Sequence, residues 1–455
     1  MSRIQRIRKG ADIRLEGRPA DTVSEAPSAH VYAVKPPDFI GVVTKLAVRV
    51  GDNVKAGSTL FYDKKSPSVK YSSPVAGTIK DIVRGAKRRI LAIEIEADSE
   101  NSYCDFGVLD VSKSNRDQIL SRVLESGMFP FFRQRPFDVV ANPDDLPRSI
   151  HVSAFDSSPL AASTFVALDG RLADFQIGID ALAKLAGEGG VHLGLRSSDT
   201  TLAGVKNCRV TYFEGPHPAG NVGVQIHHTA PLNKGVVVWT ISPQDVANLG
   251  TLLKSGKYIP SRVVACGGSE CKNPQHVLTL SGASISSIVD VPSKAHNGDE
   301  VRVISGSPLT GDQVSKDGYL GAYHSAIALL PEGHDPKFLL TTGWLSLGLD
   351  RFSLSNSFLS WLMPKSKKWA LDTNMGGEER AFVVSGQYEK VFPMDIHPVH
   401  LVKSIVVNDI DSMEKLGIYE VAPEDFALCE YGCTSKIPVQ KIVREGLDNL
   451  RNELG

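Results

Sequence analysis

Residues 41–96 restrict the possible folds most strongly, because short apolar runs there are separated by pairs of turn-forming residues. The alternating apolar positions are Leu46, Val48 and Val50, and then Leu91, Ile93 and Ile95. The turn-forming pairs are Gly51-Asp52, Ala56-Gly57, Ser66-Pro67 and Ser73-Pro74. Alternation with a period of two indicates strands, and turns this closely spaced permit only short ones. We therefore expect a small, tightly folded all-β unit.

The order of turns in this unit resembles the barrel-sandwich hybrid fold of lipoyl and biotinyl carrier domains. The resemblance leaves two alternatives: a swinging-arm carrier modified on Lys64 or Lys65, or the same fold used for docking. The hairpin at 63–67 reads Asp-Lys-Lys-Ser-Pro, whereas carriers usually have Asp-Lys-Ala or Met-Lys-Met. The rest of the chain has no signature of acyl or carboxyl transfer. We therefore favour a docking module, with the basic turn at 85–89 as its contact surface.

The composition is that of a soluble globular protein with room for two to four domains, since 42% of its 455 residues are hydrophobic and 22% are charged. A net charge of −1 gives no indication of a nucleic-acid partner. No segment approaches the roughly 18 to 20 apolar residues needed to cross a bilayer, so we expect any membrane role to be peripheral and to depend on partner subunits. The start of the chain lacks the apolar core of a signal peptide, and six cysteines are few for this length, which favours reduced thiols in the cytoplasm.

We expect a mixed α/β fold of several domains. In chain order these are an N-terminal arm (1–38), a barrel-sandwich hybrid (39–98), a helical and aromatic linker (99–148), a Rossmann-like parallel-sheet domain (149–258), a β-grasp-like domain of the SLBB type (259–335), a β-rich extension (336–397) and a C-terminal helical domain (398–455). Prolines break any long element in the arm. The tryptophans of the extension, Trp344, Trp361 and Trp369, are expected to be core or interface anchors.

The α/β region has a clear order of strands and helices. Strands are expected at 149–155, 191–195, 209–213 and 236–241. After the last one, Ser242 caps a helix with Pro243 at its first position, and another strand follows at 262–265. This strand–helix–strand unit predicts a parallel sheet with a right-handed crossover. A dinucleotide site would need G-x-G-x-x-G after the first strand, but that strand leads into Asp-Ser-Ser-Pro at 156–159. We therefore expect no nucleotide on this sheet.

Two further helices have well-marked boundaries. Asn115 caps a helix over 115–126 that ends at Gly127, and Gln118 completes the capping pattern. Pro438 opens the last helix, whose apolar residues recur at helical spacing on one side.

Residues 127–137, GMFPFFRQRPF, gather four phenylalanines around two arginines. These six residues are Phe129, Phe131, Phe132, Phe137, Arg133 and Arg135. One interpretation is an aromatic plug that joins two domains, with the arginines stacked on rings or paired with carboxylates. The other is a pocket wall for a flat ligand, whose faces the rings would cover while the planar guanidinium groups bind its polar edge.

Of the three histidines at 217–228, His217 is the candidate for function, and His227 and His228 are expected to have a structural or surface role. His217 lies between two prolines in Gly-Pro-His-Pro-Ala-Gly, where a rigid turn is the simpler interpretation. His227 and His228 are expected on a strand, where adjacent side chains point to opposite faces and cannot ligate the same ion.

The cysteines do not form a metal site by spacing. Cys266 and Cys271 have no second pair beside them, so a zinc site would lack ligands. Cys429 and Cys433 are two ligands where an iron-sulfur cluster needs more, and we expect a structural role.

Several stretches in order resemble one family along nearly the whole chain: the A subunits of bacterial Na+-translocating NADH:quinone oxidoreductases. The stretches are VRVGDNVKAG (48–57), DKKSPSVK (63–70), SPVAGTI (73–79), RGAKR (84–88), RPFD (135–138), EGPHPAG (214–220), GAS (282–284), VRVISGSPLTG (301–311), YLG (319–321), TNMGGEER (373–380), YEKV (388–391) and EVAPEDFALC (420–429). The resemblance implies a peripheral subunit on the cytoplasmic side of the bacterial inner membrane. Its partners would be the other subunits, B to F, of a six-subunit complex that oxidises NADH, reduces ubiquinone and exports Na+.

That family is similar in turn to the C subunit of Rnf electron-transfer complexes and to the flavoprotein subunit of respiratory complex I. Those relatives carry a glycine-rich flavin loop and cysteine clusters, whereas this chain has GMFPFFRQRPF and LCEYGC at the corresponding places. The resemblance therefore implies that this chain holds no tightly bound cofactor and is not catalytic by itself. The flavins and iron centres would lie on partner subunits.

The resemblance leaves two roles open. The chain either contributes to a ubiquinone site at the quinone-reducing end of the complex or serves only as a structural scaffold for it or for an Rnf-like complex. For the first role, the predicted quinone-binding residues are Phe131, Phe132, Arg133, Arg135, Phe137 and His217. No catalytic or metal-binding residue is predicted.

Overall fold

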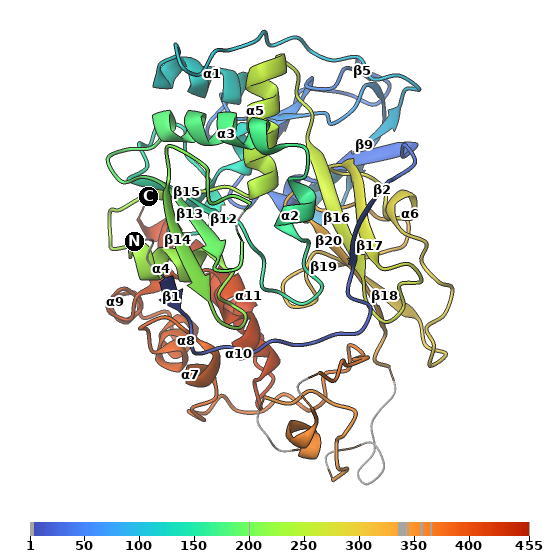
Figure 1. Ribbon diagram of the computed structural model, residues 1–455, viewed down its shortest axis with the longest axis vertical. Coiled ribbons are helices and arrows are strands. Elements are labelled where there is room, and N and C mark those ends of the chain that lie inside the picture. The colour runs from blue at the N-terminus through green and yellow to red at the C-terminus, as the bar shows by residue number, and fades with distance from the viewer. Residues whose placement is uncertain are drawn as a thin grey trace.

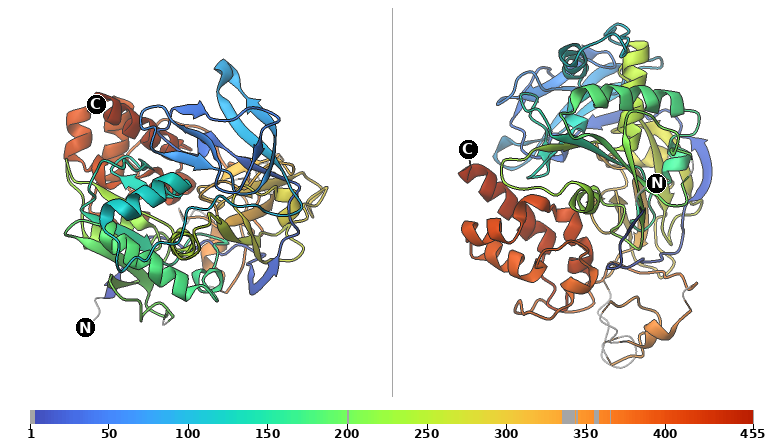
Figure 2. Two further views of the ribbon diagram at one scale, coloured as in Figure 1. Left: turned by 90° about the horizontal axis from the view of Figure 1, so that it is seen from above. Right: turned by 60° about the vertical axis from the view of Figure 1, so that its left-hand side comes forward.

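The computed structural model describes residues 4–199, 201–334, 343, 345–354, 358–364 and 366–454. In this part of the chain, four β-sheets lie against one another with helices around them (Figure 1). The C-terminal helices form a separate group beside the sheets, shown in red in Figure 2. The protein therefore has a mixed α/β fold of several domains, as expected.

The β unit predicted around residues 41–96 consists of two small sheets. One has the order β3-β9-β8-β5 and the other β4-β6-β7. The strands are β3 (Val31–Val34), β4 (Thr44–Leu46), β5 (Asn53–Val54), β6 (Thr59–Asp63), β7 (Lys70–Ser72), β8 (Gly77–Arg84) and β9 (Ile90–Ala97), with short 3-10 turns η1 (Pro36–Asp38) and η2 (Ala86–Arg88). Phe61 and Tyr71 stack in the interior with their ring centroids 4.3 Å apart. Lys64 and Lys65 are exposed at the β6–β7 hairpin.

A seven-stranded sheet has the order β1-β14-β13-β12-β15-β10-β11. Its strands are β1 (Ile4–Arg6), β10 (Arg133–Arg135), β11 (Val139–Val140), β12 (Ser149–Ser153), β13 (Gly190–Arg196), β14 (Arg209–Glu214) and β15 (Val238–Thr240). The strands from β1 to β15 in this order run parallel, and β10 joins β15 antiparallel. The four strands predicted between residues 149 and 241 are thus confirmed as β12 to β15.

Helices α1 (Arg116–Ser126), α3 (Leu172–Leu185), α4 (Val222–Thr229) and α5 (Pro243–Ser255) accompany this sheet, together with η3 (Phe129–Phe131). Helix α2 (Thr164–Ala167) instead packs on Val263 and Leu278 of another sheet. The expected capping pattern of α1 is present, since Asn115 and Gln118 exchange hydrogen bonds and Gly127 ends the helix. Ser242 caps α5 and Pro243 is its first residue, as predicted. Helices α3 and α5 approach closely because Gly178 and Gly250 lie at their crossing, where a Cβ atom would collide with backbone oxygens of the other helix.

The predicted strand–helix–strand unit after residue 236 is wrong in one respect: its two strands belong to different sheets. β15 lies in the seven-stranded sheet, whereas β16 (Ser261–Gly267) lies in a six-stranded sheet with the order β19-β18-β20-β16-β17-β2. β16 pairs antiparallel with β17 (Gln275–Leu280) and parallel with β20 (Ala326–Pro331). Helix α5 therefore connects two domains. The local pattern could not show this, because strand pairing is decided by distant segments.

The six-stranded sheet also contains β2 (Ala20–Glu25), β18 (Val301–Ser305) and β19 (Asp312–Val314), with α6 (Ile285–Ile288) beside it. β18 and β19 form a hairpin. β2 comes from the N-terminal segment, which is therefore not the separate arm that its prolines suggested. β1 extends the seven-stranded sheet, β2 the six-stranded sheet and β3 the first β unit. Figure 1 shows this segment, in dark blue, running between the sheets.

The C-terminal region is helical, as expected. It comprises α7 (Tyr388–Val391), α8 (Pro398–Val406), α9 (Ile410–Lys415), α10 (Ala427–Tyr431) and α11 (Val439–Glu453), with 3-10 turns η5 (Ile418–Glu420) and η6 (Pro423–Phe426). The β-rich extension expected over 336–397 has no strand among the described residues of that range, which hold η4 (Leu359–Leu362), α7 and one isolated bridge between Leu15 and Trp369. Trp369 is buried as an anchor should be, but Trp361 is 58% exposed. Trp344 lies outside the described residues.

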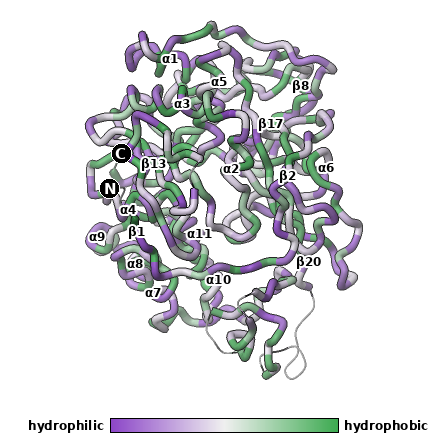
Figure 3. The backbone as a smooth tube through the Cα atoms, in the orientation of Figure 1, coloured by the Kyte–Doolittle hydropathy of each residue, from purple (hydrophilic) through white to green (hydrophobic). Residues whose placement is uncertain are grey.

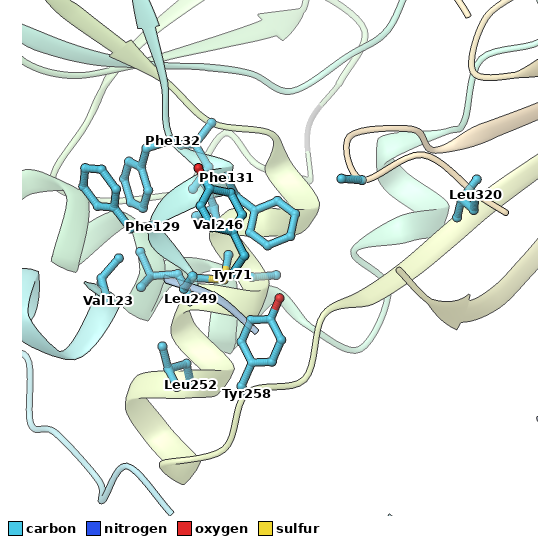
Figure 4. Close-up of a cluster of buried hydrophobic side chains, with 14 of the residues drawn as sticks. Tyr71, Val123, Phe129, Phe131, Phe132, Val246, Leu249, Leu252, Tyr258 and Leu320 are labelled. Carbon is cyan, nitrogen blue, oxygen red and sulfur yellow. The ribbon is translucent and has the colours of Figure 1, made fainter. Parts of the chain in front are cut away.

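The domains share a continuous hydrophobic core. Figure 4 shows Tyr71 of the first β unit, the phenylalanines of the linker and Leu249 of α5 gathered in one cluster. Phe129 and Phe132 both pack on Trp239 of β15, at centroid distances of 5.5 and 5.7 Å. No helix among the described residues is both long and apolar enough to cross a membrane.

Candidate binding site at the carboxyl ends of the parallel strands

A cavity of about 240 Å³ lies where the strand order of the seven-stranded sheet reverses. The chain passes from β12 to β13 on one side, and β15 lies on the other side of β12. In open parallel sheets, ligands bind in the crevice outside the carboxyl ends of the strands at this switch point. Ser153 and Thr240, at the carboxyl ends of β12 and β15, both line the cavity. The cavity therefore occupies the position where this architecture places a ligand.

The wall of the cavity comes from several parts of the chain. From residues 149–258 it includes Ser153, Phe155, Asp156, Ala162, Thr164, Ala167, Gly220, Asn221, Val222, Thr240, Ile241, Ser242, Pro243, Gln244 and Asp245; from other parts of the chain it includes Phe131, Arg133, Arg262, Tyr323, Ser325 and Glu424. The cap formed by Ser242 starts α5 directly at the end of β15, and this places Gln244 and Asp245 at the cavity. The cavity is thus lined by residues from several domains.

Arg262 and Asp245 form a buried ion pair at the base of the cavity. Their shortest N–O distance is 2.9 Å, and the side chains of both are 2% exposed. Arg262 also donates to the carbonyl oxygen of Ala322 at 2.9 Å, and Asp245 accepts from the hydroxyl of Ser242 at 2.6 Å. The two charges therefore neutralise each other.

The cavity wall also carries a phenol ring and a second guanidinium group. The guanidinium carbon of Arg133 lies 5.3 Å from the ring centroid of Tyr323, and the group is also paired with Asp138. The Tyr323 hydroxyl donates to the carbonyl oxygen of Pro130 at 2.7 Å. Burial raises the pKa of Tyr323, so the phenol stays neutral.

Phe131 completes an aromatic corner. Its ring stands at 80° to that of Tyr323 with 6.1 Å between centroids, and the guanidinium carbon of Arg262 lies 5.4 Å from its centroid. Together with Phe155, the cavity thus combines three aromatic rings with two guanidinium groups.

Three family models match this chain. One is described as the NqrA N-terminal barrel-sandwich hybrid domain (residues 5–98), one as the NqrA second alpha/beta domain (114–258) and one as the NQRA C-terminal domain (263–316). The A subunit of the Na+-translocating NADH-quinone reductase of Rhodopirellula baltica is 36% identical over 456 residues, covering 99% of this chain and 98% of that protein. Those of Serratia proteamaculans and Saccharophagus degradans are 36% and 37% identical, each covering 98% of this chain and 99% of that protein. The chain belongs to the NqrA family, the A subunits of Na+-translocating NADH-quinone reductases.

Among solved structures, an NAD+-reducing NiFe hydrogenase in the air-oxidized state is similar with a TM-score of 0.36 and 10% identity, covering 77% of this chain and 68% of that one. A likeness at this level carries no conclusion for the NqrA family member described here.

The structure divides the six residues predicted from the sequence of this NqrA family member. Phe131 and Arg133 are among the residues that line the cavity, and the other four are not. Phe132 is fully buried against Phe129 and Trp239. Phe137 packs on Tyr419 of η5, with 6.3 Å between the ring centroids. The aromatic segment thus packs between domains, and Phe131 and Arg133 in its middle line the cavity.

Arg135 is buried in a cluster of carboxylates. It lies 2.7 Å from Glu424, 3.3 Å from Asp138 and 3.7 Å from Asp425, and its side chain is 1% exposed. Burial raises the pKa of Asp425 to about 7, and the charge of Glu424 adds to this while Arg135 opposes it. For Asp138, burial acts in the same direction, but Arg133, Arg135 and Arg444 outweigh it and hold the pKa below its usual value. The cluster fastens the linker to the C-terminal helices.

His217 also makes contacts within the chain. Its Nδ1 atom lies 3.0 Å from the hydroxyl of Ser157, and its backbone N–H donates to Asp12 at 2.9 Å. Its carbonyl oxygen accepts from the N–H of Ala11 at 2.9 Å. Burial lowers the pKa of His217. These contacts join the N-terminal segment to the loop before α4, as the rigid-turn interpretation expects.

His227 and His228 lie on helix α4, not on a strand as predicted. The residues around them form a helix from Val222 to Thr229. His227 lies 2.7 Å from Glu420 through Nδ1 and accepts from the backbone N–H of Asp395 through Nε2. It therefore connects α4 to the C-terminal helices.

The six cysteines are free, and Cys266, Cys271, Cys429 and Cys433 are buried. The Tyr388 hydroxyl donates to the sulfur of Cys433 at 3.1 Å. Burial raises the pKa of Cys429. Within the described residues, no group of three or more histidines, cysteines or carboxylates is placed to hold a metal ion.

The sequence did not point to Asp245, Arg262 or Tyr323. The start of α5 after β15 was a usable signal for Asp245, because helix starts at strand ends mark binding crevices. Arg262 and Tyr323 come from the six-stranded-sheet domain, and no spacing relates them to residues 131–133.

Proposed function

We propose that this chain is the A subunit of a Na+-translocating NADH-quinone reductase complex, bound peripherally on the cytoplasmic side of the bacterial inner membrane. The support is its correspondence with proteins named as A subunits of this reductase over 98–99% of both chains. In this proposal the chain carries no flavin, nucleotide or iron centre of its own, and the other five subunits, B to F, hold them. NADH oxidation and Na+ export are activities of the assembled complex, and this chain alone is not catalytic.

The chain contributes to the quinone-reducing end through the cavity at the switch point. Ubiquinone has a flat head group with two carbonyl acceptors and no charge. One of the rings of Phe131 and Tyr323 covers a face of such a head group and the other, at 80° to it, meets its edge, where Arg133 also offers N–H donors. Phe132, Arg135, Phe137 and His217 hold the surrounding segments in place without contacting the ligand.

The charges at the cavity are the observation that favours a neutral ligand. Three carboxylates line it, from Asp156, Asp245 and Glu424, against the two guanidinium groups of Arg133 and Arg262. Both arginines are already paired, Arg133 with Asp138 and Arg262 with Asp245. A pyrophosphate would add negative charge beside these carboxylates while both arginines of the cavity are already paired, whereas a quinone adds no charge.

A photoreactive ubiquinone analogue in the purified complex tests this proposal. We expect crosslinks at Phe131 or Arg133 that excess ubiquinone prevents. Arg133→Ala should raise the KM for quinone at least tenfold in an assembled complex, because the edge donors are lost. Arg209→Ala, which removes an exposed arginine on β14, is the matched control and should leave KM unchanged. Crosslinks confined to other subunits, with KM unaltered by Arg133→Ala, would overturn the quinone site but not the family assignment.

A purely structural scaffold is the second candidate, and the Arg135 cluster favours it because this cluster joins two domains. The two roles separate on assembly. If Arg133→Ala prevents the chain from copurifying with its partners, the scaffold is supported; if the complex forms and only quinone affinity falls, the quinone site is.

A further inference from the structure

Two short stretches, 345–349 and 358–362, carry exposed apolar side chains at one end of the molecule. The exposed fractions are 49% for Leu345, 61% for Leu347, 38% for Leu349, 42% for Leu359, 58% for Trp361 and 62% for Leu362. Single exposed apolar residues are common on protein surfaces, but a contiguous group of this kind marks an interaction site.

The two stretches form one tip. The N–H of Leu359 donates to the carbonyl oxygen of Leu347 at 3.0 Å, which holds the stretches together. Gly348 adopts a φ of +59°, and the Phe358 ring occupies the space that a side chain at 348 would need. The leucines and Trp361 therefore lie on the same structure, and we call the described residues of 345–368 the apolar tip.

The base of the tip is firmly attached to the body. Trp369 is 7% exposed, donates its N–H to Arg14 at 2.8 Å and accepts from Glu16 at 2.9 Å. The Tyr431 hydroxyl donates to the carbonyl oxygen of Phe352 at 2.9 Å. Figure 1 shows the segment, in orange, projecting from the rest of the molecule, and Figure 3 shows its hydrophobic residues in green. An anchored base with an exposed apolar end is suited to insertion into an apolar environment outside the protein.

The composition of the tip fits a lipid surface. Tryptophan rings prefer the interface between head groups and acyl chains, and neighbouring lysines attract anionic lipids. Lys367 lies with its ammonium 4.4 Å from the Trp369 ring centroid and donates to the carbonyl oxygen of Leu349 at 2.6 Å, and Lys368 is exposed. The described residues of 345–368 include one acidic residue, Asp350, and three basic residues, Arg351, Lys367 and Lys368.

We propose that the apolar tip inserts into the interfacial layer of a lipid bilayer that contains anionic lipids. The chain then contacts the membrane directly as well as through partner subunits. This proposal does not depend on the quinone site, because it concerns the isolated chain and a different end of the molecule.

Flotation of the purified full-length chain with lipid vesicles tests the proposal. The vesicles contain phosphatidylethanolamine with phosphatidylglycerol, and parallel vesicles contain only phosphatidylcholine. We expect the chain to float with the anionic vesicles and Leu359→Ser/Trp361→Ser/Leu362→Ser to bind at least tenfold more weakly. The matched control is Val406→Ser/Val407→Ser, which changes two valines at the end of α8 that are 61% and 72% exposed. Its binding should equal that of the unmodified chain.

Two results would overturn the proposal. One is equal vesicle binding by the tip variant and the unmodified chain. The other is no vesicle binding by the unmodified chain; if the tip variant then also fails to copurify with the membrane subunits, the tip contacts a protein partner instead of lipid. Brominated lipids add a positional readout, since insertion predicts fluorescence quenching that Trp361→Phe reduces. Failure here leaves crosslinking of the quinone analogue unaffected, so the two proposals can be judged separately.

Discussion

The linker at 127–137 and the apolar tip have similar compositions but opposite environments. Both combine large apolar side chains with basic residues, yet Phe129 and Phe132 are fully buried whereas Trp361 is 58% exposed. The arginines of the linker are paired with carboxylates of the same chain, whereas Lys368 of the tip is exposed to solvent. The side chains of the linker therefore make their contacts within the chain, whereas those of the tip remain available for contact with a lipid bilayer.

Removal of the buried charge in the linker should have the largest effect. Arg135→Met leaves Asp138, Glu424 and Asp425 without their shared cation, and breaking a buried pair costs about 3–5 kcal/mol. We expect a loss of at least this size in the free energy of unfolding, measured by urea denaturation at pH 8. Lys368→Met in the tip is the matched control, with a change below about 0.5 kcal/mol. A small effect of Arg135→Met would mean that the cluster does not hold the domains together.

The apolar residues of the two regions should differ almost as much. Phe132→Ala opens a cavity beside Phe129 and Trp239, and such truncations cost about 3–5 kcal/mol. Trp361→Ala removes a larger ring that is mostly exposed to solvent. The free energy of unfolding of the isolated chain should therefore fall by less than about 0.5 kcal/mol. Both are measured by the same denaturation. If Trp361→Ala destabilises the isolated chain as strongly, the tip is a packed part of the fold and its availability to lipid is lost.

The same contrast explains what could be predicted from the sequence. The strands from β12 to β15 and the capped starts of α1 and α5 follow local rules, and these were predicted correctly. The membership of β16 in another sheet, and the pairing of the N-terminal strands with three sheets, depend on partners far along the chain. Local patterns carry no information on such pairings.

Prediction of the site was limited in the same way. Phe131 and Arg133 were identified because they belong to an unusual local cluster, whereas Arg262 and Tyr323 reach the cavity from another domain. Arg133 and Arg135 look equivalent in sequence and share a face of β10. Their positions along the strand separate them, since Arg133 stands opposite Thr240 at the cavity and Arg135 opposite Val238.

Asp425 should make the smallest but most specific difference. Its pKa is raised to about 7, so between about pH 4 and pH 7 the folded chain keeps a proton that the unfolded chain has lost. The contribution of this group to stability is therefore present at low pH, falls as pH rises to about 7 and is constant above. Asp425→Asn has no carboxyl group to ionise. Its free energy of unfolding should therefore rise by at least about 1.4 kcal/mol relative to that of the unmodified chain between pH 4.5 and pH 8, the equivalent of one pKa unit.

Urea denaturation of Asp425→Asn and the unmodified chain at each pH measures this gain, and the difference between the two chains cancels the titration of all groups that they share. The depressed pKa of Asp138 acts below this range, where its stabilisation is lost as pH falls. Asp350→Asn, in the exposed tip, is the matched control and should show no gain. If the difference in the free energy of unfolding stays constant with pH, Asp425 is ionised throughout this range. Arg135 would then outweigh burial at Asp425, just as the arginines do at Asp138.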